Sequence, residues 1–220
     1  MTVSTFYPDA DVETDTVDGW AEHVGDAVWD TIHDGAGTGS NDAHSVNFLD
    51  LCSTSTTNQW ERMIRNFYLF DTSSIPDGDA IDSATFEQVF TASQDDFTSS
   101  ISLVTTTPNA NNDLVNGDYT QVGTTKQATD VTIAGLTVDS STYNAMTLNA
   151  TGLGNISKTG ITKFGTRHLA DLSDTEPTWA SSSCSKASSA SADEVLAGDK
   201  RPKLVVTHSI AFVPKIVCIS

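Results

Sequence analysis

The sequence predicts an all-β protein, an antiparallel β-sandwich of the jelly-roll type with one or two short helical turns. Helical periodicity is scarce along the 220 residues. Short runs of β-branched and aromatic residues are separated by Ser, Thr, Asn, Asp and Gly, which are typical turn residues. The spacing of these runs is typical of sandwiches, which often reach this length as a single domain.

Ten segments carry strand signals because they are rich in β-branched or aromatic residues and are bounded by turn residues. They span residues 4–8, 18–24, 44–53, 61–71, 84–90, 99–107, 131–138, 143–150, 161–167 and 203–210.

The segment 64–71 (IRNFYLFD) predicts a central strand. Tyr68 and Phe70 share one face of an extended chain, and Phe67 and Leu69 share the other. Both faces are therefore apolar, which indicates a second layer on one side and a loop or a partner on the other.

Two stretches predict short helical turns. Residues 25–37 place Val28, Trp29 and Ile32 on one side and end in glycines. Residues 151–160 predict a single turn that ends at Gly160.

The remaining segments are predicted to be loops. The segments 36–47 and 173–200 are expected to face solvent, and Trp179 is expected to anchor the second of them.

The three cysteines are too few and too scattered to predict a disulfide framework, and their spacing is not that of a zinc site. We expect Cys52, Cys184 and Cys218 to be buried or free thiols.

The net charge of −18 makes nucleic acid an improbable partner, because such a surface repels phosphate. No run is long enough to span a membrane, so no membrane partner is expected. The first residues lack the pattern of a signal peptide, which predicts folding in a host cytoplasm.

The sequence predicts no catalytic residue, no metal ligand and no cofactor. None of the five histidines lies two or four positions from another, and no GxSxG turn is present. The acidic segment 77–87 has its glycine at the wrong position for an EF-hand loop. A pair of glycosidase carboxylates stays open, since only their separation in space identifies them.

The four tryptophans, Trp20, Trp29, Trp60 and Trp179, have two interpretations. Tryptophan rings stack against the apolar faces of sugars, and Trp60 is the best candidate for such an exposed edge position. Packing at the rim of the core is the interpretation that we favour.

Several motifs resemble those of DNRLRE-type β-sandwich modules. Residues 65–90 hold an arginine, a strand that ends in Phe-Asp, a Ser-Ile-Pro turn and a strand that begins Ile-x-Ser-Ala. Residues 149–167 and 201–208 resemble the closing half of the module, and residues 5–20 are similar to the start of uncharacterised tailed-virus proteins that carry it. The resemblance covers most of residues 3–209.

This resemblance implies a jelly-roll-like sandwich used for extracellular attachment or as a virion component. Its shared positions are core and turn positions, so it implies no catalytic or ligand residue. The absence of a signal peptide favours the viral version, whose proteins assemble inside the host and leave by lysis.

The last residues form an apolar tail after the predicted sandwich domain of residues 1–209. The tail, residues 210–220, either folds back as an extra strand or adds to the open edge of a neighbouring subunit. We expect the contact with another subunit, because an unpaired apolar strand promotes aggregation. The contacting residues would be Ile210, Phe212, Val213, Ile216, Val217 and Ile219.

The sequence therefore predicts a non-enzymatic structural protein of a tailed virus (phage), either an outer capsid decoration protein or a fibre or spike component. Its expected location is the virion, and its expected partners are copies of itself, as a trimer by analogy, and other virion proteins such as the major capsid protein. The alternatives are a carbohydrate-binding module or adhesin that contacts cell-surface glycans, an extracellular filament subunit and, third, a hydrolase.

Overall fold

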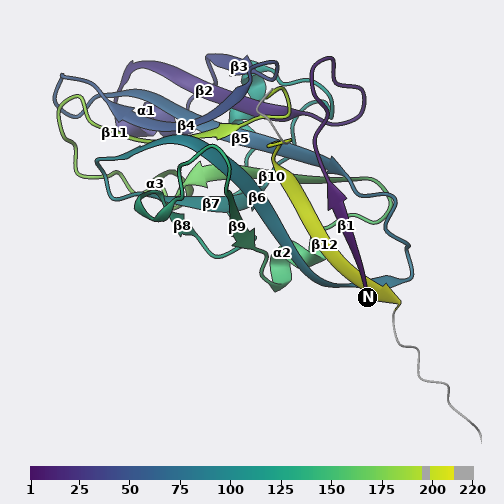
Figure 1. The fold of residues 1–220 in the computed structure, drawn as a ribbon. Coiled ribbons are helices and arrows are strands. Elements are labelled where there is room, and N and C mark those ends of the chain that lie inside the picture. The colour runs from purple at the N-terminus through teal and green to yellow at the C-terminus, as the bar shows by residue number, and fades with distance from the viewer. Residues whose placement is uncertain (195–198, 211–220) are drawn as a thin grey trace, which may run out of the picture.

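The computed structural model describes residues 1–194 and 199–210 and confirms an all-β fold (Figure 1). Its helices are short, and none within the described ranges is long and apolar enough to cross a membrane. The strands are β1 (Thr2–Phe6), β2 (Asp18–Ala27), β3 (Gly39–Asn41), β4 (Val46–Ser53), β5 (Trp60–Asp71), β6 (Asp79–Asp95), β7 (Ser100–Thr105), β8 (Val131–Thr132), β9 (Tyr143–Thr147), β10 (Ile161–His168), β11 (Cys184–Ala190) and β12 (Lys203–Ile210). The helices are α1 (Trp29–Asp34), α2 (Ala150–Gly154) and α3 (Leu169–Leu172), with 3₁₀ turns η1 (Asn116–Thr120) and η2 (Ile133–Gly135).

These strands pair antiparallel in the order β1-β12-β6-β11-β4-β5-β10-β7-β8, with β2, β3 and β9 attached beside this path. The long strand β6 belongs to two layers. Its first half pairs with β12 and β9, and its second half pairs with β11. The sheet therefore curls into a sandwich of the jelly-roll-like kind, with a small layer of β1, β12, β6 and β9 against a large layer of the other strands.

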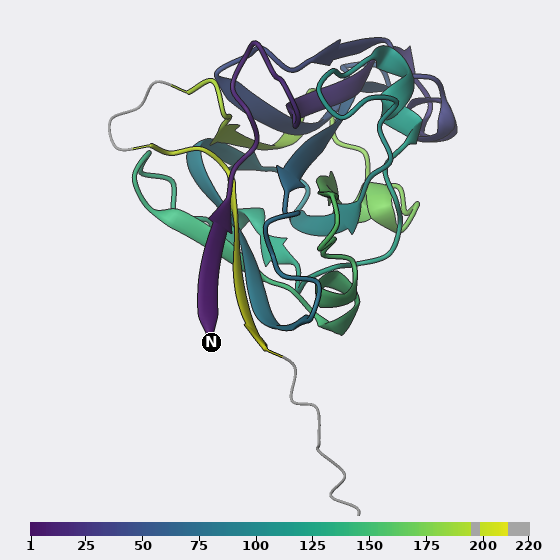
Figure 2. The same ribbon diagram turned by 90° about the vertical axis from the view of Figure 1, so that its right-hand side faces the viewer.

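The two ends of the described chain lie side by side in the small layer. β1 pairs with β12 from Thr2 opposite His208 to Phe6 opposite Leu204. Both views show the N-terminus next to the end of β12 (Figures 1 and 2). β1 is consequently the edge strand of this layer.

The central position of β5 is confirmed, because all of its residues from Met63 to Phe70 are buried. Tyr68 and Phe70 point into the core between the layers, where they pack with Phe86 and its neighbours. Phe67 and Leu69 point the other way, into a second core beneath α1 and η1. The two apolar faces of this strand thus correspond to two separate cores.

The prediction that residues 173–200 form a solvent-facing loop is wrong, because β11 lies inside this segment between β4 and β6. Serine and alanine have weak strand propensity, so tertiary pairing decides this element. Small side chains fit there, and Ser185 Oγ donates to Asp95 Oδ1 at 2.8 Å. Gln88 Nε2 donates to Ser189 Oγ at 3.0 Å, so polar partners satisfy the buried hydroxyls.

Several other boundaries differ from the prediction. Of the expected strand 131–138, only Val131–Thr132 form a strand, and the turn η2 follows with Ile133 buried. The turn predicted over 151–160 is α2, which Asn149 caps by accepting from the Gly152 backbone N–H at 2.9 Å. It ends at Gly154, with Asn155 as its C-cap, and not at Gly160.

Two further elements differ from the prediction. The segment 36–47 contains the short strand β3, which pairs with β2, and α3 was not predicted. The helical turn predicted over residues 25–37 is confirmed as α1, which buries Trp29 and Ile32, whereas Val28 precedes the helix and is 49% exposed.

The prediction that Cys52 and Cys184 are thiols is wrong, because they form a disulfide. The two residues lie directly opposite each other on β4 and β11, with Cα atoms 4.2 Å apart. The two cysteines are 132 residues apart in the sequence, and no local pattern predicts that they meet. Cys218 lies outside the described residues.

Candidate functional site

The predicted subunit contact begins at Ile210, the last residue of β12, whose side chain is 87% exposed. The other predicted contact residues lie outside the described part of the chain. These are Phe212, Val213, Ile216, Val217 and Ile219. Ile210 pairs with Asp79 of β6 and lies beyond the last paired position of β1, and the outer side of β1 is the open edge of the small layer in the described chain.

The outer surface of the small layer is formed by side chains that alternate with the buried ones on four neighbouring strands. Thr207 on β12 faces Val3 on β1 and Ser83 on β6, and the next row follows the same register. We call this surface the neutral face. Its members are Val3, Thr5, Ser83, Thr85, Thr147, Val205 and Thr207.

The neutral face is unusual in a chain with 29 acidic and 11 basic residues, because none of its seven members is charged. The nearest charged row is a cross-strand pair in which Lys203 Nζ lies 3.1 Å from Glu87 Oε2, and these charges cancel. Asp82 lies at the bulge of β6 where the face ends. Val3 is 65% exposed, so the face presents apolar as well as hydroxyl groups to its surroundings.

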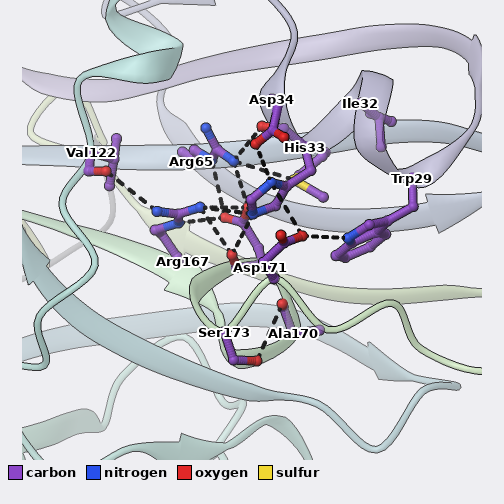
Figure 3. A network of polar contacts seen from close by, with 12 residues as sticks. Trp29, Ile32, His33, Asp34, Arg65, Val122, Arg167, Ala170, Asp171 and Ser173 are labelled. Carbon is purple, nitrogen blue, oxygen red and sulfur yellow. Dashed lines mark hydrogen bonds and ion pairs between the residues drawn. The ribbon is translucent and has the colours of Figure 1, made fainter.

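A buried ion network connects the large layer to its cover (Figure 3). Arg65 on β5 and Arg167 on β10 each make two hydrogen bonds to the Asp171 carboxylate of α3, at 2.6–3.0 Å. Burial alone would raise the pKa of Asp171, but the charges and hydrogen bonds of the two arginines lower it well below its ordinary value. His33 Nε2 lies 2.8 Å from the Asp171 carbonyl oxygen.

The protein itself supplies the hydrogen-bond acceptors for both arginines of this network. Arg65 also donates to the carbonyl oxygens of Tyr119 and His33 at 2.9 Å, and its guanidinium lies 4.1 Å from the Tyr119 ring centroid. Arg167 donates to the carbonyl oxygens of Val122 and Gly123. Each arginine is only 3% exposed, so we interpret the network as a clamp that holds α1, η1 and α3 on the sheet.

Ser99 and His168 form a serine–histidine pair that the sequence did not reveal. Ser99 Oγ lies 2.8 Å from Nδ1 of His168, and Nε2 of His168 lies 3.2 Å from the Leu49 carbonyl oxygen. A carbonyl thus occupies the place that the carboxylate has in a catalytic triad. Burial lowers the pKa of His168 to about 4, which makes the imidazole a weak base near neutral pH. Ser99 and the Leu49 carbonyl therefore satisfy the two ring nitrogens of the buried His168.

An acidic cluster lies where the start of β2 meets the segment after β11. Asp18 accepts from Asn47 Nδ2 at 2.5 Å and from the Ala192 backbone N–H at 3.0 Å. Burial raises the pKa of Asp18 to about 7, and it also raises the pKa of Glu13 to about 7. Among the described residues, no group of three or more His, Cys, Asp or Glu side chains is arranged to hold a metal ion.

The four tryptophans divide into two buried and two half-buried residues. Trp60 is fully buried, which agrees with the favoured packing interpretation and excludes this side chain as an exposed platform for sugars. Trp29 is 5% exposed and packs edge-on against Trp60, with ring centroids 5.3 Å apart. Trp20 is half-buried and packs against Phe48, whereas Trp179 is half-buried beside a surface hollow.

Two hollows lie on either side of Glu176 and Pro177. The first has a volume of about 490 Å³, and its walls include Trp179, Asn58 and Asp30. The second has a volume of about 280 Å³, and its walls include Phe97 and several hydroxyl side chains. The two residues that both hollows share, Glu176 and Pro177, lie in the segment 173–200 that the sequence predicted to be loop.

Comparison with known proteins finds no protein-family model that matches the chain and no curated protein that is similar to it.

Proposed function

We propose that this protein is a non-enzymatic structural component of a tailed-virus particle, either an outer capsid decoration protein or a fibre or spike component. The motif resemblance to virion-associated β-sandwich modules suggests this role, and a jelly-roll-like sandwich suits it. In this proposal the protein contacts copies of itself and other virion proteins such as the major capsid protein.

The neutral face is the observation that carries the proposal. Two copies that each have a net charge of −18 repel each other, and the repulsion is smallest where both surfaces lack charge. A face made of Val, Thr and Ser on four strands permits such an approach with small loss of hydration. We therefore propose that the neutral face contacts a second copy of this chain.

The apolar tail supports the same proposal. Ile210 leaves the small layer next to β1, whose outer edge has no neighbouring strand within the described chain. In the proposal, residues 210–220 of one copy pair with the β1 edge of the next copy. A contact between two different surfaces forms a ring when its rotation closes and a filament when it does not, and we propose a closed ring of three copies.

The charge of the remaining surface suits an exposed place on the particle, because acidic side chains repel packaged DNA. The disulfide suits it too, since a particle released by lysis enters an oxidising medium where Cys52 and Cys184 stay paired.

The mass of the full chain in solution, from light scattering after gel filtration, tests the self-association. We expect three copies of the 23.4 kDa chain. Thr85→Arg and Thr207→Arg on the neutral face should give monomers, and so should a chain that ends at residue 210. Thr57→Arg, at an exposed position outside the face, is the matched control and should leave the trimer intact.

A wild-type monomer at every concentration would contradict the self-association. Trimers of Thr85→Arg and Thr207→Arg would exclude the neutral face as the contact. The virion role is tested separately by antibody labelling of purified particles in the electron microscope, and particles that lack the protein would refute it.

A further inference from the structure

The two hollows beside Glu176 and Pro177 are neighbouring concave surfaces, which we call together the groove. Both hollows are lined by Glu176 and Pro177, so these two residues lie between them. Their volumes of about 490 and 280 Å³ fall in or near the range of small-molecule sites. A ligand of several linked rings is needed to occupy both.

Each of the two hollows has an aromatic side chain in its lining. Trp179 lines the first hollow, and its Nε1 donates to the Gln59 carbonyl oxygen at 3.2 Å, which fixes the plane of the ring. Phe97 lines the second hollow and packs against Trp60, with ring centroids 5.3 Å apart. Half-buried rings that are held in one orientation are suited to stack against the C–H faces of sugars.

Polar groups that line the groove suit a ligand with many hydroxyl groups. Glu176 Oε1 accepts from Trp60 Nε1 at 2.8 Å, so the carboxylate is anchored although the residue is exposed. Asn58 and Asp30 add an amide and a second carboxylate to the first hollow. Carboxylates accept hydrogen bonds, and amides both donate and accept them, which matches sugar hydroxyls.

The charge of the lining decides which sugars fit. The walls of both hollows contain carboxylates, and no Lys or Arg contributes to them. Because the whole chain carries a charge of −18, an anionic polysaccharide is repelled at long range as well. The groove therefore selects uncharged sugars.

We propose that the groove between Trp179 and Phe97 binds an uncharged oligosaccharide. The oligosaccharide passes over Pro177 and stacks one sugar ring on Trp179. This activity goes beyond the structural role proposed above and does not depend on it.

The test uses the full-length protein and isothermal titration with uncharged hexasaccharides of glucose, N-acetylglucosamine, mannose and galactose, and hyaluronan as an anionic comparison. We expect binding of at least one uncharged hexasaccharide and none of hyaluronan. Trp179→Ala and Asn58→Ala should each weaken that binding tenfold or more. Glu176→Gln, which keeps an oxygen to accept from Trp60, should weaken it less than Trp179→Ala does.

Trp20→Ala is the matched control, because Trp20 is also half-buried but packs against Phe48 away from the groove. It should leave the affinity unchanged. Far-ultraviolet circular dichroism and the melting temperature must show that each variant is folded, and Asn58→Ala, in an exposed turn, keeps the test valid if Trp179→Ala unfolds. Absence of binding to all four uncharged hexasaccharides overturns the proposal. So does binding that survives both groove substitutions, or hyaluronan binding equal to that of the uncharged sugars.

Discussion

Arg65 and Asp171 form a fully buried ion pair, in which Nη2 of the arginine donates to Oδ1 of the aspartate at 2.6 Å. The residues are 106 positions apart, on β5 and α3. The pair holds the one-turn helix α3 against the sheet. The segment that follows α3 lines the groove.

Asp171→Asn should destabilise the protein strongly, because it removes the only negative charge that is hydrogen-bonded to the two buried arginines in the described structure. Breaking a buried ion pair costs about 3–5 kcal/mol. Urea denaturation followed by tryptophan fluorescence measures this loss. The control is Asp199→Asn, which removes a half-exposed pair with Arg201 and should cost less than about 1 kcal/mol. Equal losses in the two variants would contradict the clamp interpretation.

Replacing both Cys52 and Cys184 with alanine should lower the free energy of unfolding by about 2–4 kcal/mol, because the disulfide restricts the unfolded chain over a long loop. Dithiothreitol should lower the melting temperature of the wild type and leave that of the double variant unchanged. Intact mass after alkylation without reductant gives an independent measurement. Labelling of Cys52 and Cys184 in the folded wild type would refute the pairing.

Asp18→Asn should make stability less dependent on pH between about 4 and 7. Burial raises the folded pKa of Asp18 to about 7 from an ordinary value of 3.8. As pH rises through this window the unfolded state releases the proton first, so the wild type loses stability, and this loss stays complete above pH 7. The asparagine has no proton to lose. Urea midpoints measured from pH 4 to pH 8 test this.

Glu13→Gln should act in the same direction, because burial raises the pKa of Glu13 to about 7 as well. Its effect should be smaller, since Glu13 is half-buried and solvent screens its charge. A wild-type curve that rises from pH 4 to pH 7 by more than the Asp18→Asn curve would contradict the assigned sign.

Gly165→Ala should destabilise the protein by about 1–3 kcal/mol, the usual cost of overpacking. A Cβ atom on Gly165 would lie 2.3 Å from the Asn66 carbonyl oxygen and 2.4 Å from Thr106 Cγ2, so β5 and β10 would have to separate. The control is Gly154→Ala at the end of α2, where no atom lies within 4 Å, and it should be neutral or stabilising by about 0.5 kcal/mol. Thermal melts of both variants provide the comparison.

The sequence predicted the elements whose side chains show a strong pattern. The two apolar faces of residues 64–71 correctly placed β5 between two buried regions, and β-branched runs located most other strands. The candidate sites were predicted less well. The tail was identified by its composition, but the neutral face requires the register of β1, β12, β6 and β9. No local pattern marks β11, the arginine clamp or the groove.

The sequence by itself determined the fold class, the acidic surface and the two-sided burial of the central strand, because alternation and turn residues act between near neighbours in the chain. Tertiary structure alone decided that Cys52 meets Cys184, that Asp171 meets two arginines and that Trp60 is buried while Trp179 is partly exposed. These contacts join residues that lie far apart in the sequence, and their formation depends on how the curled sheet brings distant strands and loops together.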